Sequence, residues 1–220
     1  MKKGLLSFLL IIFSLFSFQT GCKEEFNLKD YVSYYQSNVY VGDYNGEKIT
    51  AFYGQAEYPY KSDGIKGDLL PFLTFKMSAT ETNVNYNVNI TTDKEYQADF
   101  TFEPIKSHLT ATLPVKTLDA YSFDATVTVK NEPTTVKFTS IVPSNIISVD
   151  KALSSLRISQ QSYIDSLIDG DNFNAEIIVK LTVVKDKPYY YIGIADKSNN
   201  YKALLIDGVS AEVLAIRNVY

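Results

Sequence analysis

A strict alternation of apolar and polar residues constrains the fold of this chain more than any other feature. The clearest case is residues 83–90, where Asn-Val-Asn-Tyr-Asn-Val-Asn-Ile places an asparagine at every second position. Successive side chains of a β-strand point to opposite faces of the sheet, so this segment has one apolar and one polar face. The pattern predicts a strand that is buried on one side and solvated on the other.

The same period of two recurs across residues 39–143. Turn signals separate the alternating segments; Asn45-Gly46, for example, suits the positive φ angles of a tight hairpin. Many short alternating strands, with no helical segment between them, favour an antiparallel sandwich. We therefore expect an immunoglobulin-like β-sandwich in residues 39–143. This describes architecture only, because the chain has no tryptophan and only one cysteine.

The period changes after residue 143. Ser148 can cap a helix whose apolar residues recur at helical spacing over 149–156, and a second short helix is expected to end with Gly170 as its C-cap. Strands are predicted after these helices, at residues 177–183, 188–195, 201–206 and 212–219. Residues 144–220 thus read as a small α+β domain, with helices on one face of an antiparallel sheet, in a chain that is mainly β.

The first 21 residues have the composition of a secretion signal. Lys2 and Lys3 precede an apolar run over 5–18, which is shorter than the roughly 20 residues of a membrane-spanning helix. The following Gln-Thr-Gly-Cys at 19–22 resembles the lipobox of bacterial lipoproteins. This resemblance implies a signal peptide at 1–21 and a lipid on Cys22, which would anchor the protein to the extracytoplasmic face of the cell membrane. Because Gln19 stands where an aliphatic residue is usual, an ordinary signal peptide and a freely secreted protein is the alternative.

Residues 22–38 are expected to form a tether with one short helix. Asn27 suits a helix N-cap, and Leu28, Tyr31, Val32 and Tyr35 recur at the spacing of one helical face. The alternative is a stalk without regular structure.

Composition and missing motifs exclude several classes of function. The chain has 21 Lys and Arg against 25 Asp and Glu, which argues against a nucleic-acid partner. Its single cysteine cannot form an internal disulfide, and its single histidine, His108, provides no zinc cluster and no Ser-His-Asp arrangement. Nucleotide-binding loops and hydrolase motifs are also missing, so we expect no cofactor and no enzymatic activity.

The C-terminal strands resemble those of PepSY-type domains, which are small extracytoplasmic modules. The resemblance rests on Tyr-Tyr-Tyr-Ile-Gly-Ile at 189–194, the strand at 201–207 and Glu-Val-Leu at 212–214, and it covers roughly residues 148–219. Ser210-Ala211 replaces the Thr-Gly pair of that family. The resemblance implies a protein-binding or inhibitory role near secreted peptidases or cell-wall enzymes, and no catalytic residues.

Two sets of side chains are candidates for a binding site. Tyrosines can present flat, amphipathic rings to a sugar or a peptide, and the candidates are Tyr189, Tyr190, Tyr191 and Tyr201. Carboxylate and amide oxygens bind calcium, and an oxygen-rich loop offers Asp169, Asp171, Asn174 and Glu176. The structural alternatives are half-buried strand residues for the first set, and a helix cap and turn for the second.

These observations predict a lipid-anchored binding protein of the cell envelope. Its partner would be an envelope or secreted protein, for instance an enzyme that it regulates or inhibits, and its membrane contact would be the lipid on Cys22. Two alternatives stay open. One is a hydrolase of envelope sugars or peptides that uses two carboxylates, and the other is a purely structural spacer.

Overall fold

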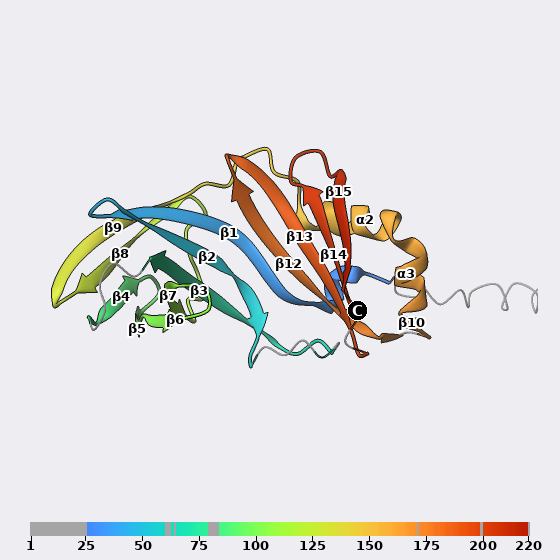
Figure 1. Cartoon of the computed structure of the whole chain (residues 1–220), viewed down its shortest axis with the longest axis horizontal. Coiled ribbons are helices and arrows are strands. Elements are labelled where there is room, and N and C mark those ends of the chain that lie inside the picture. The colour runs from blue at the N-terminus through green and yellow to red at the C-terminus, as the bar shows by residue number, and fades with distance from the viewer. Residues whose placement is uncertain are drawn as a thin grey trace, which may run out of the picture.

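The computed structural model describes residues 26–59, 63, 65–78, 84–170, 172–198 and 200–219. Within this part the chain is mainly β with a small helical part, which confirms the predicted fold class. One sheet of thirteen strands dominates, and its longest strand is β1 (Val32–Tyr44). Figure 1 shows β1 crossing the molecule, from a barrel at one end to a helix-covered sheet at the other.

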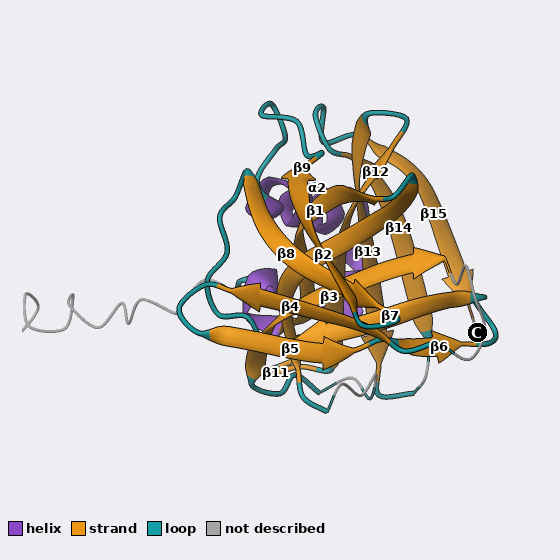
Figure 2. Ribbon diagram, turned by 90° about the vertical axis from the view of Figure 1, so that its left-hand side faces the viewer, coloured by secondary structure: helices purple, strands orange, loops and turns teal. Residues whose placement is uncertain are grey.

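The second half of β1 belongs to the barrel. The other barrel strands are β2 (Glu47–Glu57), β3 (Leu69–Ser78), β4 (Tyr86–Thr91), β5 (Glu95–Asp99), β6 (Thr101–Glu103), β7 (His108–Leu113), β8 (Ser122–Val129) and β9 (Glu132–Ser140). Pairing runs from β1 through β2, β3 and β7 to β6, and from β5 through β4, β8 and β9 back to β1. Phe100 joins β5 to β6 and bonds through its N–H to the carbonyl oxygen of Tyr86. The expected antiparallel strands are present, and their pairing forms one path with β6 and β5 at its two ends, which curls into a barrel (Figure 2).

Local sequence signals account for the barrel strands. Asn45 and Gly46 have φ angles of 52° and 88°, and the side chain of Asp43 accepts the N–H of Gly46, so the predicted hairpin turn is confirmed. On β4, Tyr86, Val88 and Ile90 are buried while the asparagines between them are not. The strict alternation of apolar and polar residues therefore corresponds to the inner and outer faces of the barrel.

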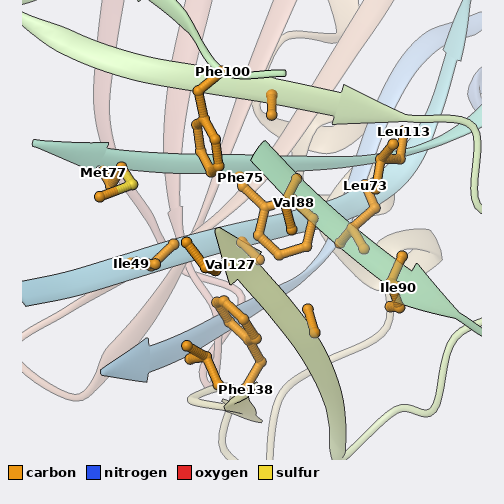
Figure 3. Packing of buried hydrophobic residues seen from close by; sticks show 14 of the residues in the cluster. Ile49, Leu73, Phe75, Met77, Val88, Ile90, Phe100, Leu113, Val127 and Phe138 are labelled. Atoms are coloured by element: carbon orange, nitrogen blue, oxygen red, sulfur yellow. The ribbon is translucent and has the colours of Figure 1, made fainter. Parts of the chain in front are cut away.

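Aromatic and aliphatic side chains fill the barrel interior. Ile49, Leu73, Phe75 and Phe138 have no exposed surface, and the rings of Phe75 and Phe138 meet edge to face at 5.2 Å between centroids (Figure 3). On β1, Gly42 leaves room for β9, because a Cβ there would lie 2.6 Å from a methyl carbon of Val136. The barrel therefore encloses a packed core.

The remaining elements form the helix-covered sheet. They are α2 (Val149–Ser159), α3 (Gln161–Ser166), β10 (Ile168–Asp169), β11 (Asn172–Phe173), β12 (Ala175–Val184), β13 (Lys187–Asp196), β14 (Tyr201–Asp207) and β15 (Val213–Val219). Strands β12 to β15 are antiparallel neighbours, and both helices pack on one face through a second hydrophobic core. Ser148 caps α2 as predicted, by accepting the N–H of Lys151. Gly170 is not a helix C-cap, because Ile168 and Asp169 pair with β11 and place Gly170 in the turn between these strands.

The helix predicted from Asn27 to Tyr35 is mostly wrong. Asn27 does cap a helix, but it is the four-residue 3₁₀ helix η1 (Leu28–Tyr31), and β1 begins at Val32. The strand continues because Val32 to Gln36 pair with β12 in parallel on one edge, while Tyr34 to Gln36 pair with β2 on the other. The segment expected to be a tether thus contributes to the second core and links both parts of the molecule.

Candidate functional site

The four candidate tyrosines lie on two faces of the sheet. Tyr190 is buried under the helices, where its hydroxyl donates to the carbonyl oxygen of Ile147 at 2.9 Å, and burial raises its pKa. Tyr189 and Tyr191 point to the opposite face, as their places beside Tyr190 require. The hydroxyls of Tyr191 and Tyr201 lie 3.1 Å apart. The structure therefore brings Tyr191 and Tyr201 together and assigns Tyr190 to the core.

The described calcium candidates do not converge. Asp169 is exposed in β10, whereas Glu176 is fully buried on β12. The amide oxygen of Asn174 accepts a hydrogen bond from the ammonium of Lys197 at 2.9 Å, so a cation already occupies this ligand atom. Asp171 lies outside the described residues. Among the residues that the structure describes, no three His, Cys, Asp or Glu side chains cluster as metal ligands.

Two further residues singled out in the sequence have simple outcomes. His108 is buried at the start of β7, with Nδ1 3.0 Å from the carbonyl oxygen of Lys106 and Nε2 3.7 Å from the carboxylate of Glu103. Cys22 lies outside the described residues, so lipidation stays a prediction.

An apolar surface that the sequence did not predict forms across β1, β2 and β3. The rings of Tyr34 on β1 and Phe72 on β3 meet over the intervening β2, with centroids 5.2 Å apart. They can meet because β2 offers small residues: Ala56 stands opposite Tyr34, and Gly54 stands opposite Phe72. Gly54 is also required by the backbone, since a Cβ there would lie 2.0 Å from the carbonyl oxygen of Tyr35.

This surface is hollowed into an open pocket of about 540 Å³. We call it the Tyr34–Phe72 pocket; its apolar wall includes Tyr34, Ala56, Tyr58, Leu70, Phe72 and Pro114. Tyr58 and Leu70 are 83% and 51% exposed, so large apolar groups stand at its mouth. Its volume falls in the range of pockets that hold small organic ligands, about 300–1,000 Å³.

The electrostatics of the pocket are set by burial. Loss of solvent raises the pKa of Tyr34 to about 12, so its hydroxyl is neutral and can donate a hydrogen bond. The ammonium of Lys180 lies 5.3 Å from the centroid of the Tyr34 ring. Burial, and then the charge of Lys106, lower the pKa of Lys180. Lys180 is exposed on β12; it stands beside the pocket and is not among its lining residues.

Glu57 is the one carboxylate among the described residues that line this pocket. Its side chain, at the end of β2, is 8% exposed and accepts the N–H of Gly67 at 2.6 Å through Oε2. No sequence signal separates Glu57 from an ordinary solvated strand residue, because its burial depends on the return of the chain at Gly67. A buried carboxylate in an apolar pocket can act as a polar contact that orients a bound ligand.

A larger pocket of about 680 Å³ lies between residues 26–28 and α2. Its charged groups already have partners. Oδ1 of Asp150 lies 3.0 Å from Nζ of Lys29, and Nη2 of Arg157 lies 2.6 Å from Oδ1 of Asp165. Because these charged groups are already paired, the Tyr34–Phe72 pocket is the better candidate for a ligand site.

No protein-family model matches the chain. No curated protein matches it either. In the part of the chain that the structure describes, no helix has the length and apolarity needed to cross a membrane.

Proposed function

We propose that this protein is a lipid-anchored extracytoplasmic binding protein that holds a small apolar ligand in the Tyr34–Phe72 pocket. The observation that carries the proposal is the pocket itself: about 540 Å³ of open space, walled by aromatic and aliphatic side chains, on three hydrogen-bonded strands. Burial of a ligand's apolar surface there is favourable by roughly 25 cal/mol per Å² before the costs of association.

The hydrolase alternative has less support. Retaining and inverting glycosidases need two carboxylates that face each other across the substrate. The described lining of the pocket supplies only Glu57. A protein partner in the envelope, as the resemblance to PepSY-type domains implies, stays a prediction.

The ligand proposal is tested with two matched lysine variants. Leu70 at the pocket mouth and Ile216 on β15 are 51% and 49% exposed, so Leu70→Lys and Ile216→Lys introduce the same charge at comparable exposure. We expect Leu70→Lys to weaken binding of the neutral dye Nile red at least fivefold, and Ile216→Lys to leave it within twofold of the wild type. Equal affinity of Leu70→Lys and the wild type would contradict the proposal.

The anchor is tested separately. Metabolic labelling with a fatty-acid analogue is expected to mark the wild-type protein and not Cys22→Ser, and the label should follow the membrane fraction. An unlabelled wild-type protein in the medium would mean that the protein is secreted free.

A further inference from the structure

Glu57 separates two hollows at the end of β2. Glu57 and Tyr58 line the Tyr34–Phe72 pocket, and the same two residues line a neighbouring pocket of about 250 Å³ against Asp63 and residues 65–68. The carboxylate is therefore at the junction of an apolar space and a smaller, more polar space. Only 8% of Glu57 is exposed, so a ligand group in either pocket meets a small part of this side chain.

Half of the Glu57 carboxylate has no partner in the described part of the protein. Oε2 accepts the N–H of Gly67, but Oε1 is shielded from water and accepts no hydrogen bond from a described residue. A buried acceptor without a hydrogen bond carries an uncompensated desolvation cost. Because Oε1 is shielded, a ligand donor reaches it only when the Glu57 side chain rotates toward the pocket. Such a donor would remove this cost and would bind more strongly than to a solvated carboxylate.

The charge around Glu57 favours a cationic donor. Asp63 and Asp68 line the smaller pocket together with Glu57, and Lys66 is the one described cation in that lining. The ammonium of Lys66 donates to the carbonyl oxygen of Asp30 at 2.6 Å, so it is directed elsewhere. The Tyr34–Phe72 pocket has no Lys or Arg among its described lining residues, and the ammonium of Lys180 beside it lies over the Tyr34 ring, 5.3 Å from its centroid.

We propose that the ligand of this pocket is an amphiphilic amine: an apolar body that fills the Tyr34–Phe72 pocket, with an ammonium group that donates to Oε1 of Glu57. This inference rests on the proposed function, because the apolar body uses the same pocket. It adds the chemical class of the ligand and gives Glu57 the role of its polar contact.

The test uses two probes that differ only in their terminal group, 4-phenylbutylamine and 4-phenylbutanol. Binding of each is measured at pH 7 by calorimetry, with protein purified from cells that express the whole chain. We expect the amine to bind about tenfold more tightly than the alcohol. This wild-type comparison needs no variant, so it stands even where a substitution at Glu57 impairs folding.

Variants then assign the preference to Glu57. In Glu57→Gln the amine is expected to lose its advantage while the alcohol keeps its affinity. The control is Glu132→Gln, an exposed acid on β9, which should keep the tenfold preference. A preference that persists in Glu57→Gln would overturn the inference. Binding of the alcohol with no gain for the amine would also overturn it and leave the proposed function intact, whereas failure of both probes to bind would overturn both.

Discussion

The side-chain amide of Gln36 donates to the main-chain carbonyl oxygen of Leu181, at the point where the sheet divides. Gln36 is the last residue of β1 that pairs with β12, and from Tyr40 onward β9 takes the same edge of β1. The side chain of Gln36 is buried. Its amide provides the donor that a paired main chain would otherwise provide to the carbonyl oxygen of Leu181. The side chain of Gln36 thus supplies a hydrogen bond at the fork between the barrel and the helix-covered sheet.

Removal of this amide should destabilise the fork. Gln36→Met keeps the length of the side chain but leaves the carbonyl oxygen of Leu181 without its donor, which is expected to lower the free energy of unfolding by about 1–3 kcal/mol. The matched control is Gln55→Met on β2, where the glutamine is exposed. Urea unfolding measures both variants, and an equal loss in the two would contradict this role of Gln36.

The buried hydroxyl of Tyr190 offers a comparison between adjacent tyrosines. Tyr190→Phe removes the donor to the carbonyl oxygen of Ile147 and is expected to cost about 1–3 kcal/mol, because both groups are buried. Tyr189→Phe, on the other face of the same strand, should cost less than about 0.5 kcal/mol. The thermal unfolding of the two variants checks this difference, and a Tyr189→Phe variant as unstable as Tyr190→Phe would contradict the assignment.

The carboxylate of Asp119 makes part of the stability depend on pH. It accepts the N–H groups of Ser122 and Tyr121, and these hydrogen bonds lower its pKa in the folded state. A carboxylate with a lowered pKa contributes stability above its unfolded pKa of about 3.9, and this contribution is lost as the pH falls through the folded pKa. Asp119→Asn should therefore be less stable than the wild type at pH 7, and this difference should vanish at strongly acidic pH.

The control for this pH dependence is Asp124→Asn, which changes an exposed carboxylate on β8. Denaturant unfolding between pH 2 and pH 7 measures both variants. A stability gap for Asp119→Asn that stays constant across this range would show that charge on Asp119 is not its cause.

Local signals in the sequence were sufficient for many elements. The asparagine alternation, the Asn45-Gly46 turn and the Ser148 cap act over a few residues, and the structure confirms each of them. The helix predicted near Tyr35 failed for a physical reason. A bulge between Val32 and Tyr34 turns Val32 and Tyr35 to the same core, so an irregular strand reproduces the three-residue spacing of a helix.

The pocket could not be predicted from local signals because it depends on pairing between distant segments. Tyr34 and Phe72 meet only when β2 lies between β1 and β3. A second irregularity, between Gln36 and Asn38, changes which face of the sheet the following side chains of β1 point to. The carboxylate of Glu57 accepts the N–H of Gly67, a contact that the local sequence does not indicate. Tyr34 on β1 pairs in parallel with Ile178 on β12. These two strands are far apart in the sequence, so no local turn signal indicates that they pair. The composition predicts that strands form, but the position of the pocket depends on which residues of those strands are paired.

Ligand binding in the Tyr34–Phe72 pocket is the central claim, and NMR on alanine and leucine methyl groups tests it most directly. A titration with 4-phenylbutanol should shift the methyl signals of Ala56 and Leu70, which line the pocket, along saturable curves that share one dissociation constant. Leu214 and Ala215 on β15 serve as internal controls and should not move. Saturable shifts at Ala56 and Leu70, with no such shifts on β15, are the predicted result. The contradicting result is the absence of saturable shifts at these two residues, or larger shifts on β15.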